Sequence, residues 1–159
     1  MLLDRLPPFV RTHYECHEWK HASAILIQDF PAEWRDVMDA LTEFRLRRSW
    51  VAVGGGSKSQ VSGWIDGFLG RRGWRETQFQ TGVVVDGVEL ASPTHKVDCF
   101  RNGVALEIEW NNKDPFYDRD LNNFRLLFDL RVVSVGIIVT RADELQDIFA
   151  ALGRGASYG

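Results

Sequence analysis

Three acidic residues gather around one predicted turn in the stretch VDCFRNGVALEIEW. Asp98 precedes the dipeptide Asn102-Gly103, and Glu107 and Glu109 follow it. Asn-Gly is preferred in two-residue type I′ turns, because both of its residues tolerate a positive φ. The sequence therefore predicts a β-hairpin that carries the three carboxylates on its two strands.

The hairpin register decides which of these side chains meet. With Asn102-Gly103 as the whole loop, Asp98 lies directly opposite Glu107, and Lys96 lies opposite Glu109. Because side chains alternate along a strand, Glu107 and Glu109 share one face. The other face pairs apolar residues, Val97 with Ile108 and Cys99 with Leu106. The turn and the hydrophobic pattern thus predict the same register.

Like charges placed opposite each other destabilise a sheet. Keeping Asp98 against Glu107 therefore requires a bound cation, a raised pKa or full hydration. Mg²⁺ prefers oxygen ligands and keeps some waters, so these two carboxylates and the backbone carbonyl of Ile108 are suitable ligands. The alternative is the polar outer face of a half-buried strand, on which Lys96 neutralises Glu109. The spacing alone does not separate the two interpretations.

The elements that must position this hairpin alternate between helices and strands. Periodicity predicts strands at 22–30, 81–90, 94–100, 104–110 and 132–140, and helices from Pro31 to Phe44, from Val61 to Phe68, after Asp118 as N-cap, and from Leu145 to Leu152. The run VVSVGIIVT is almost continuously apolar, as in a buried parallel strand. This order predicts the α/β class, with a mixed central β-sheet flanked by helices.

The composition suits one soluble domain. The chain has 159 residues, of which 45% are hydrophobic and 26% charged, which is enough for one core. Its start lacks a signal-peptide pattern, no apolar run is long enough for a membrane span, and two cysteines give no disulfide framework. The net charge of -3 still permits a local basic groove for DNA. We expect a single cytoplasmic domain over residues 1–159 that binds no membrane.

The pattern of acids resembles a known catalytic core. Asp, eight residues, Glu, one residue, Glu on a hairpin is similar to the PD-(D/E)XK nucleases, in the variant whose usual lysine is replaced by glutamate or glutamine. More closely, HKVDCFRNGVALEIEWNNKDPFYDRDLNNFRLLFDL resembles the BglII-type restriction endonuclease family. The segments HASAILIQDFPAEW, GGGSKS and RRGWRET resemble that family in the same order, so the resemblance covers nearly the whole chain.

This resemblance implies a restriction-endonuclease-like core that cleaves double-stranded DNA with Mg²⁺, for which Mn²⁺ can substitute. By position, Asp98 and Glu107 would be metal ligands, together with the carbonyl of Ile108. Glu109 stands at the variable lysine position, where it would orient or deprotonate the attacking water. Glu76 is the candidate for an additional upstream acidic residue.

Basic and amide side chains around the hairpin are candidate DNA contacts. The set comprises Lys58, Lys113, Arg119, Asn122 and Arg125. Ordinary surface charge or helix capping explains the same residues equally well. The triple-glycine loop before Lys58 lacks the GxxxxGK[ST] spacing, so no nucleotide cofactor is expected. That loop is either a flexible turn or a backbone contact to a DNA phosphate.

The sequence thus predicts a Mg²⁺-dependent type II site-specific deoxyribonuclease of a restriction system. A homodimer is expected, because symmetric half-sites suit symmetric subunits. The helix with Trp64 and Phe68 is a candidate dimer surface, although core burial explains these aromatics as well. The alternatives are a related repair or structure-selective nuclease and a non-catalytic DNA-binding module on the same fold. Members of the family continue into a further strand, so the domain is expected to lack a C-terminal segment.

Overall fold

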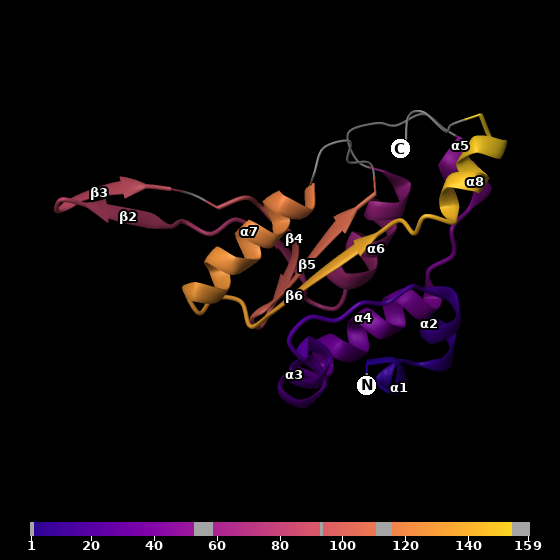
Figure 1. Ribbon diagram of the computed structural model, residues 1–159, viewed down its shortest axis with the longest axis horizontal. Helices are drawn as coiled ribbons and strands as arrows, with labels where there is room; N and C mark the ends of the chain where they lie inside the picture. The colour runs from indigo at the N-terminus through magenta and orange to yellow at the C-terminus, as the bar shows by residue number, and fades with distance from the viewer. Residues whose placement is uncertain (1, 53–58, 93, 111–115, 154–159) are drawn as a thin grey trace.

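A four-stranded sheet lies at the centre of the computed structural model, which describes residues 2–52, 59–92, 94–110 and 116–153 (Figure 1). Its order is β1 (Arg75–Thr77), β4 (Val97–Arg101), β5 (Val104–Glu109) and β6 (Val135–Thr140). β4 is antiparallel to β1 and β5, and β6 is parallel to β5. The predicted mixed sheet of an α/β fold is confirmed.

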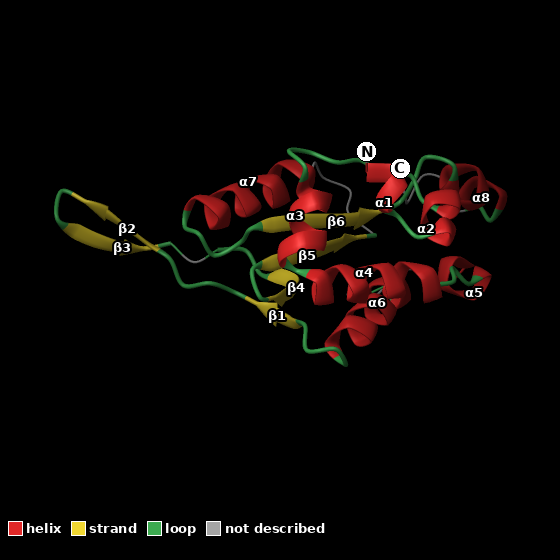
Figure 2. Cartoon of the chain, turned by 90° about the horizontal axis from the view of Figure 1, so that it is seen from below, coloured by secondary structure: helices red, strands yellow, loops and turns green. Residues whose placement is uncertain are grey.

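Helices cover both faces of this sheet. α7 (Phe116–Asp129) lies on one face, and α4 (Pro31–Glu43) and α6 (Gln60–Gly70) lie on the other (Figure 2). The shorter helices are α1 (Leu2–Arg5), α2 (Pro8–His13), α3 (Ala22–Asp29), α5 (Arg48–Ala52) and α8 (Leu145–Ala151). Two further strands, β2 (Gly82–Val85) and β3 (Val88–Ala91), pair only with each other. Within the described ranges, no helix is both long and apolar enough to cross a membrane.

The predicted helices at α4, α6 and α8 are confirmed. α4 and α6 carry their apolar stripes on the buried side, whereas α8 buries Phe149 and leaves Ile148 49% exposed. α8 ends as expected before Gly153, which has a φ of +70°. Asp118 is not the N-cap of α7, because the helix already begins at Phe116 and Asp118 lies in its first turn. Phe68 is buried in the core and Trp64 stacks on its ring at 5.3 Å, so core packing accounts for both aromatics.

The strand predicted at 22–30 is wrong, because Ala22–Asp29 forms α3. Only Ser23 and Leu26 of this helix are buried, three residues apart, while Ile25 is exposed. A short apolar run such as AILI does not by itself distinguish a strand from a helix. Here the burial of Ser23 and Leu26, at a helical spacing of three residues, is the pattern of a helix with one buried side.

The hairpin between β4 and β5 forms as predicted. Asn102 and Gly103 have φ values of +48° and +85°, as a type I′ turn requires. The ladder then pairs Arg101 with Val104, Phe100 with Ala105 and Cys99 with Leu106, which is the predicted register. The ladder ends at the Cys99–Leu106 pair, before Asp98 reaches Glu107.

A β-bulge in β4 interrupts the expected alternation at Asp98. Arg75 of β1 pairs with Phe100 of β4, and Thr77 pairs with Val97. The two pairs are two residues apart on β1 and three residues apart on β4, so β4 carries an extra residue. Val97 consequently packs on the α7 side of the sheet, and not beside Cys99 as the alternation predicted. Bulges bend a strand and re-aim a side chain, often next to an active site.

A network of charged groups fixes the turn of this hairpin against α4. The buried carboxylate of Asp36 accepts hydrogen bonds from Arg101 Nη1 at 2.7 Å, Trp74 Nε1 at 3.0 Å and Arg72 Nη1 at 3.2 Å. Glu33, also buried, contacts Arg101 Nε at 3.1 Å and Asn102 Nδ2 at 2.8 Å. β4 and the segment before β1 are therefore held by the same helix.

Candidate functional site

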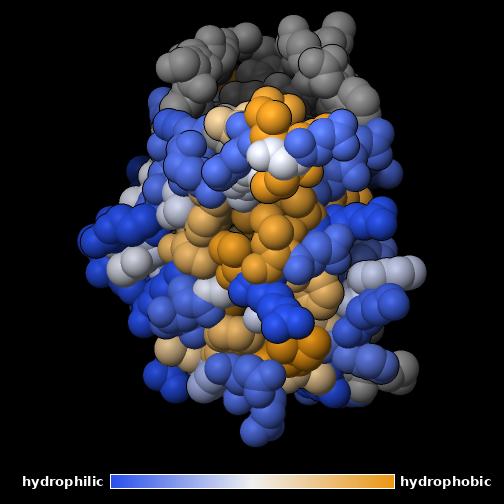
Figure 3. All heavy atoms as spheres, turned by 90° about the vertical axis from the view of Figure 1, so that its left-hand side faces the viewer, coloured by the Kyte–Doolittle hydropathy of each residue, from blue (hydrophilic) through white to orange (hydrophobic). Residues whose placement is uncertain are grey.

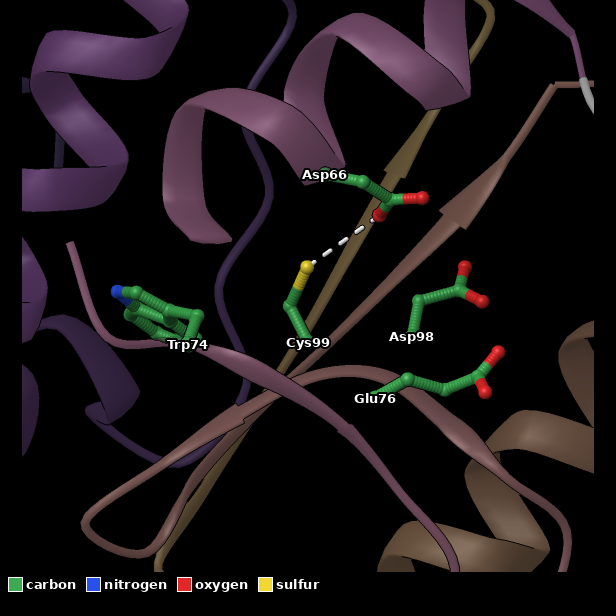
Figure 4. A pocket seen from close by; sticks show the side chains of 5 residues that line it. All are labelled: Asp66, Trp74, Glu76, Asp98 and Cys99. Atoms are coloured by element: carbon green, nitrogen blue, oxygen red, sulfur yellow. Dashed lines mark hydrogen bonds between the residues drawn. The ribbon is translucent and has the colours of Figure 1, made fainter. Parts of the chain in front are cut away.

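A cavity of about 240 Å³ opens between α6 and the strands β1 and β4. Asp66 from α6, Trp74 and Glu76 at β1, and Asp98 and Cys99 from β4 line it. In Figure 4 the carboxylates of Glu76 and Asp98 point the same way, and Asp66 approaches Cys99 from α6. The Cys99 thiol donates to Asp66 Oδ1 at 3.4 Å. Because Asp98 and Cys99 are consecutive, both can line one cavity only where the bulge interrupts the alternation.

Asp98 and Glu107 are held by each other's strands. The Asp98 amide donates to Glu107 Oε2 at 3.2 Å, and Asp98 Oδ2 accepts from the Ile108 amide at 2.9 Å. The two carboxylates come together as predicted, but through backbone amides and not as a directly opposed pair of the ladder. Each carboxylate therefore has a fixed position before any cation binds.

The environment of Glu107 opposes its ionisation. Only 3% of this residue is exposed. Burial, followed by the negative charge of Asp98, raises the pKa of Glu107 from 4.5 to about 8. The hydrogen bond from the Asp98 amide acts in the opposite direction, but it is outweighed. A cation placed beside this carboxylate would relieve both unfavourable effects.

Glu109 belongs to a second cluster, on the side of the sheet covered by α7. Arg119 Nη2 contacts Glu109 Oε1 at 2.6 Å and Asp120 Oδ1 at 2.9 Å. Burial and the neighbouring Asp120 raise the pKa of Glu109 to about 7, against the opposing effect of Arg119. The proposed pairing of Lys96 with Glu109 is wrong, because Lys96 instead contacts Glu76 at 3.0 Å. The positive charge beside Glu109 therefore comes from Arg119 on α7, which lies over β5, and not from a lysine of the hairpin.

Sequence reasoning missed three polar residues of this region. Neither the spacing of the acids nor the family resemblance points to Asp66, Asp120 or Asn123. Asp120 and Asn123 are 2% and 6% exposed, and their Oδ2 and Nδ2 atoms have no hydrogen-bond partner in the described structure. Their spacing of three residues, in phase with Phe124 and Leu127, was the available signal that they face the sheet.

Of the predicted DNA contacts, Asn122 and Arg125 are exposed on α7, and Arg119 is half-exposed in its contact with Glu109. Lys58 and Lys113 lie outside the described residues. Glu76, predicted as an additional acidic residue, lines the cavity together with Asp98.

The donor set around Asp98 fits a hard divalent cation. In the described ranges, no group of three or more His, Cys, Asp or Glu side chains is assembled as a metal site. Magnesium does not require one, because it often binds through one or two carboxylates and fills its remaining positions with water and substrate phosphate. Asp98 and Glu107 are the candidate carboxylate ligands, and the Ile108 carbonyl is a candidate third ligand.

Comparison with known proteins shows a family to which the chain is similar. A family model described as restriction endonuclease BglII/BglIII matches residues 14–158. The matched range includes the cavity, the β4–β5 hairpin and α7. No curated protein and no solved structure matches the chain.

Proposed function

Because the chain belongs to the BglII/BglIII restriction endonuclease family and is a type II restriction endodeoxyribonuclease, we propose that Asp98 and Glu107 bind the Mg²⁺ with which it hydrolyses DNA. The carrying observation is the position of Glu107, which is almost fully buried against Asp98 with its pKa raised to about 8. Without a cation, the repulsion between the two carboxylates only destabilises the fold. With a bound divalent cation, both carboxylates serve as its ligands and the repulsion is relieved.

Each residue near the cavity has a chemical task in this proposal. When bound, Mg²⁺ would act as a Lewis acid that polarises the phosphate and lowers the pKa of a bound water. Mn²⁺ would serve in the same way. Asp98 and Glu107 hold the cation in the positions that the backbone amides of β4 and β5 already give them. The carbonyl of Ile108 completes the protein's share of ligands. Glu76, which faces the same cavity, is the additional acidic residue.

Glu109 is the proton acceptor in this proposal. A general base acts best when its pKa lies near the working pH, and the pKa of Glu109 is raised to about 7. Arg119 contacts Glu109 at 2.6 Å and favours its ionised form, so the base is available at neutral pH. The exposed Asn122 and Arg125 on α7 contact the DNA, as do Lys58 and Lys113. The enzyme acts as a homodimer on a palindromic site.

The deciding experiment is digestion of methyl-free phage DNA with and without Mg²⁺, followed by sequencing of the fragment ends. We expect discrete fragments with one common end sequence for the wild type, and no cleavage by Asp98→Asn. Asp129→Asn, which removes an exposed carboxylate at the end of α7, is the matched control and should cleave normally. Smeared products would indicate a nuclease without site specificity. DNA binding without cleavage at any divalent concentration would refute the proposal.

A further inference from the structure

The hairpin of β2 and β3 projects away from the body of the protein (Figure 1). Its turn residues Asp86 and Gly87 have φ values of +51° and +82°, which form a type I′ turn. Every residue of both strands is exposed, and neither strand pairs with the central sheet. An isolated two-stranded hairpin is marginally stable at best in water, so this element requires a packing partner.

One face of this hairpin is apolar and the other is not. The register pairs Val83 with Leu90, Val84 with Glu89 and Val85 with Val88. Because successive side chains point to opposite faces, Val83, Val85, Val88 and Leu90 share one face, whereas Val84 lies with Glu89 on the other. These four apolar residues are 53%, 49%, 60% and 52% exposed, so no part of the chain that the structure describes covers them. We call this set the apolar face of the hairpin.

Exposed apolar side chains also lie on α7, against which the hairpin's base packs. The base of the hairpin packs there, because Phe79 contacts the cluster that contains Phe124 and Leu127. Leu121 and Phe128 are seven residues apart on one side of α7 and are 55% and 60% exposed. Figure 3 looks onto this end of the molecule and shows apolar atoms in a band through its middle, bordered by hydrophilic atoms.

The size and charge of this surface indicate its partner. The four residues of the apolar face, together with Leu121 and Phe128, are each about half-exposed, so they open apolar surface on the order of several hundred Å² to solvent. A stable interface buries about 800 Å² per partner, of which about 65% is apolar in homodimers. From Gln78 to Thr94 the only charged residues are Asp86 and Glu89. A segment with two acids and no base is unsuited to DNA, whose phosphates are bound by Lys and Arg.

We propose that this hairpin is a dimerisation arm whose apolar face packs on the hairpin and the α7 flank of a second copy of the chain. A two-fold axis makes such an interface self-complementary, because the same surface serves on both protomers. The interface rests on the homodimer proposed above, but not on the cation site. Its test therefore measures association and not cleavage.

The test compares two substitutions on neighbouring residues of one strand. Val83→Glu places a charge on the apolar face, and Val84→Glu places the same charge on the opposite face. Sedimentation velocity over a concentration series is expected to show a wild-type dimer, a dissociation constant at least ten-fold higher for Val83→Glu, and no change for Val84→Glu. Melting temperatures at low concentration should agree for the two variants, because neither side chain contacts the protomer core.

Three outcomes would overturn the dimerisation arm. The wild type could remain monomeric at high micromolar concentration, or the two variants could associate equally well. Alternatively, Val83→Glu could weaken DNA binding without affecting association, which would make DNA the partner. Loss of Mg²⁺-dependent cleavage in an intact dimer would instead count against the proposed cation site and leave the interface standing.

Discussion

The backbone amide of Asp98 donates a hydrogen bond to the side chain of Glu107 at 3.2 Å. The side chain of Asp98 in turn accepts one from the amide of Ile108, the neighbour of Glu107, at 2.9 Å. Each carboxylate is thus positioned by the strand that carries the other. Such preorganisation matters for a cation site, because the ligands need not be reoriented when the cation binds.

The first prediction concerns the stability of the cation-free protein against pH. The pKa of Glu107 is about 8 in the folded protein and near 4.5 in the unfolded chain. Between these values the folded state keeps a proton that the unfolded state has lost, so stability falls as pH rises through this window and levels off above it. Glu107→Gln removes this dependence, and we expect the variant to be more stable than the wild type by about 1–3 kcal/mol above pH 8.

Urea denaturation in a chelating buffer, at pH 4.5 and at pH 8.5, measures this difference. The two proteins should be about equally stable at the lower pH, where Glu107 is protonated in the folded state and still about half-protonated in the unfolded chain. Addition of Mg²⁺ at pH 8.5 should stabilise the wild type and not the variant, since the variant lacks the ligand. A variant that is less stable than the wild type at pH 8.5 would assign Glu107 a purely structural role.

The second prediction concerns the network that anchors the hairpin turn. Asp36→Asn leaves Arg101 and Arg72 without their shared carboxylate inside the protein. Breaking a buried ion pair by removing one partner costs about 3–5 kcal/mol, and we expect a loss in this range. Asp39→Asn is the matched control. Asp39 contacts only Arg72 in this network and its side chain is 41% exposed, so its loss should cost about 1 kcal/mol or less. Thermal denaturation of the two variants distinguishes a network centred on Asp36 from a general effect of lost charge.

The third prediction tests the close packing of α7 on β6. A Cβ at Gly136 would collide with the ring of Phe124, which is buried among Val97, Ala105 and Leu127. Gly136→Ala should therefore destabilise the protein by about 1–3 kcal/mol, the usual cost of overpacking. Gly63→Ala on α6 is the control, because an added Cβ meets nothing within 4 Å there and alanine favours a helix. Equal stability of the two variants in urea would contradict the close contact.

The hairpin could be predicted from the sequence because its turn is determined locally. A type I′ turn requires a positive φ at two consecutive residues, and Asn102-Gly103 meets this requirement without tertiary help. The bulge at Asp98 could not be predicted in this way. Val97 is apolar and fits either face of the sheet, so the hydrophobic pattern tolerates an extra residue without any visible sign.

The polar partners of the site depend on tertiary placement. Arg119 and Glu109 lie on different elements, and their contact arises only because α7 packs over β5. Asp66 reaches the cavity because α6 packs on the other face of the same sheet. The sequence identified the carboxylates of the hairpin, but the residues supplied by the helices follow from the order of the strands and not from local spacing.

The last prediction concerns Glu109, whose pKa of about 7 suits a proton acceptor. Its carboxyl must lose a proton before it accepts one from water, so the wild-type cleavage rate at saturating Mg²⁺ should rise through pH 7 and then level off. Glu109→Gln cannot accept a proton, although it can still orient a water by hydrogen bonding. We expect this variant to cleave about 10²–10⁴ times more slowly and to lose the rise near pH 7.

Single-turnover cleavage of a plasmid, measured from pH 5.5 to 9, tests this expectation. Asp118→Asn is the control, because Asp118 is an exposed carboxylate of α7 that should not affect the rate or its pH dependence. Loss of the pH-dependent rise would assign that rise to the ionisation of Glu109, whose charged form the Arg119 contact favours. A wild-type rate and an unchanged pH profile in Glu109→Gln would remove Glu109 from the reaction and leave Asp98 and Glu107 as the carboxylates that act on the phosphate.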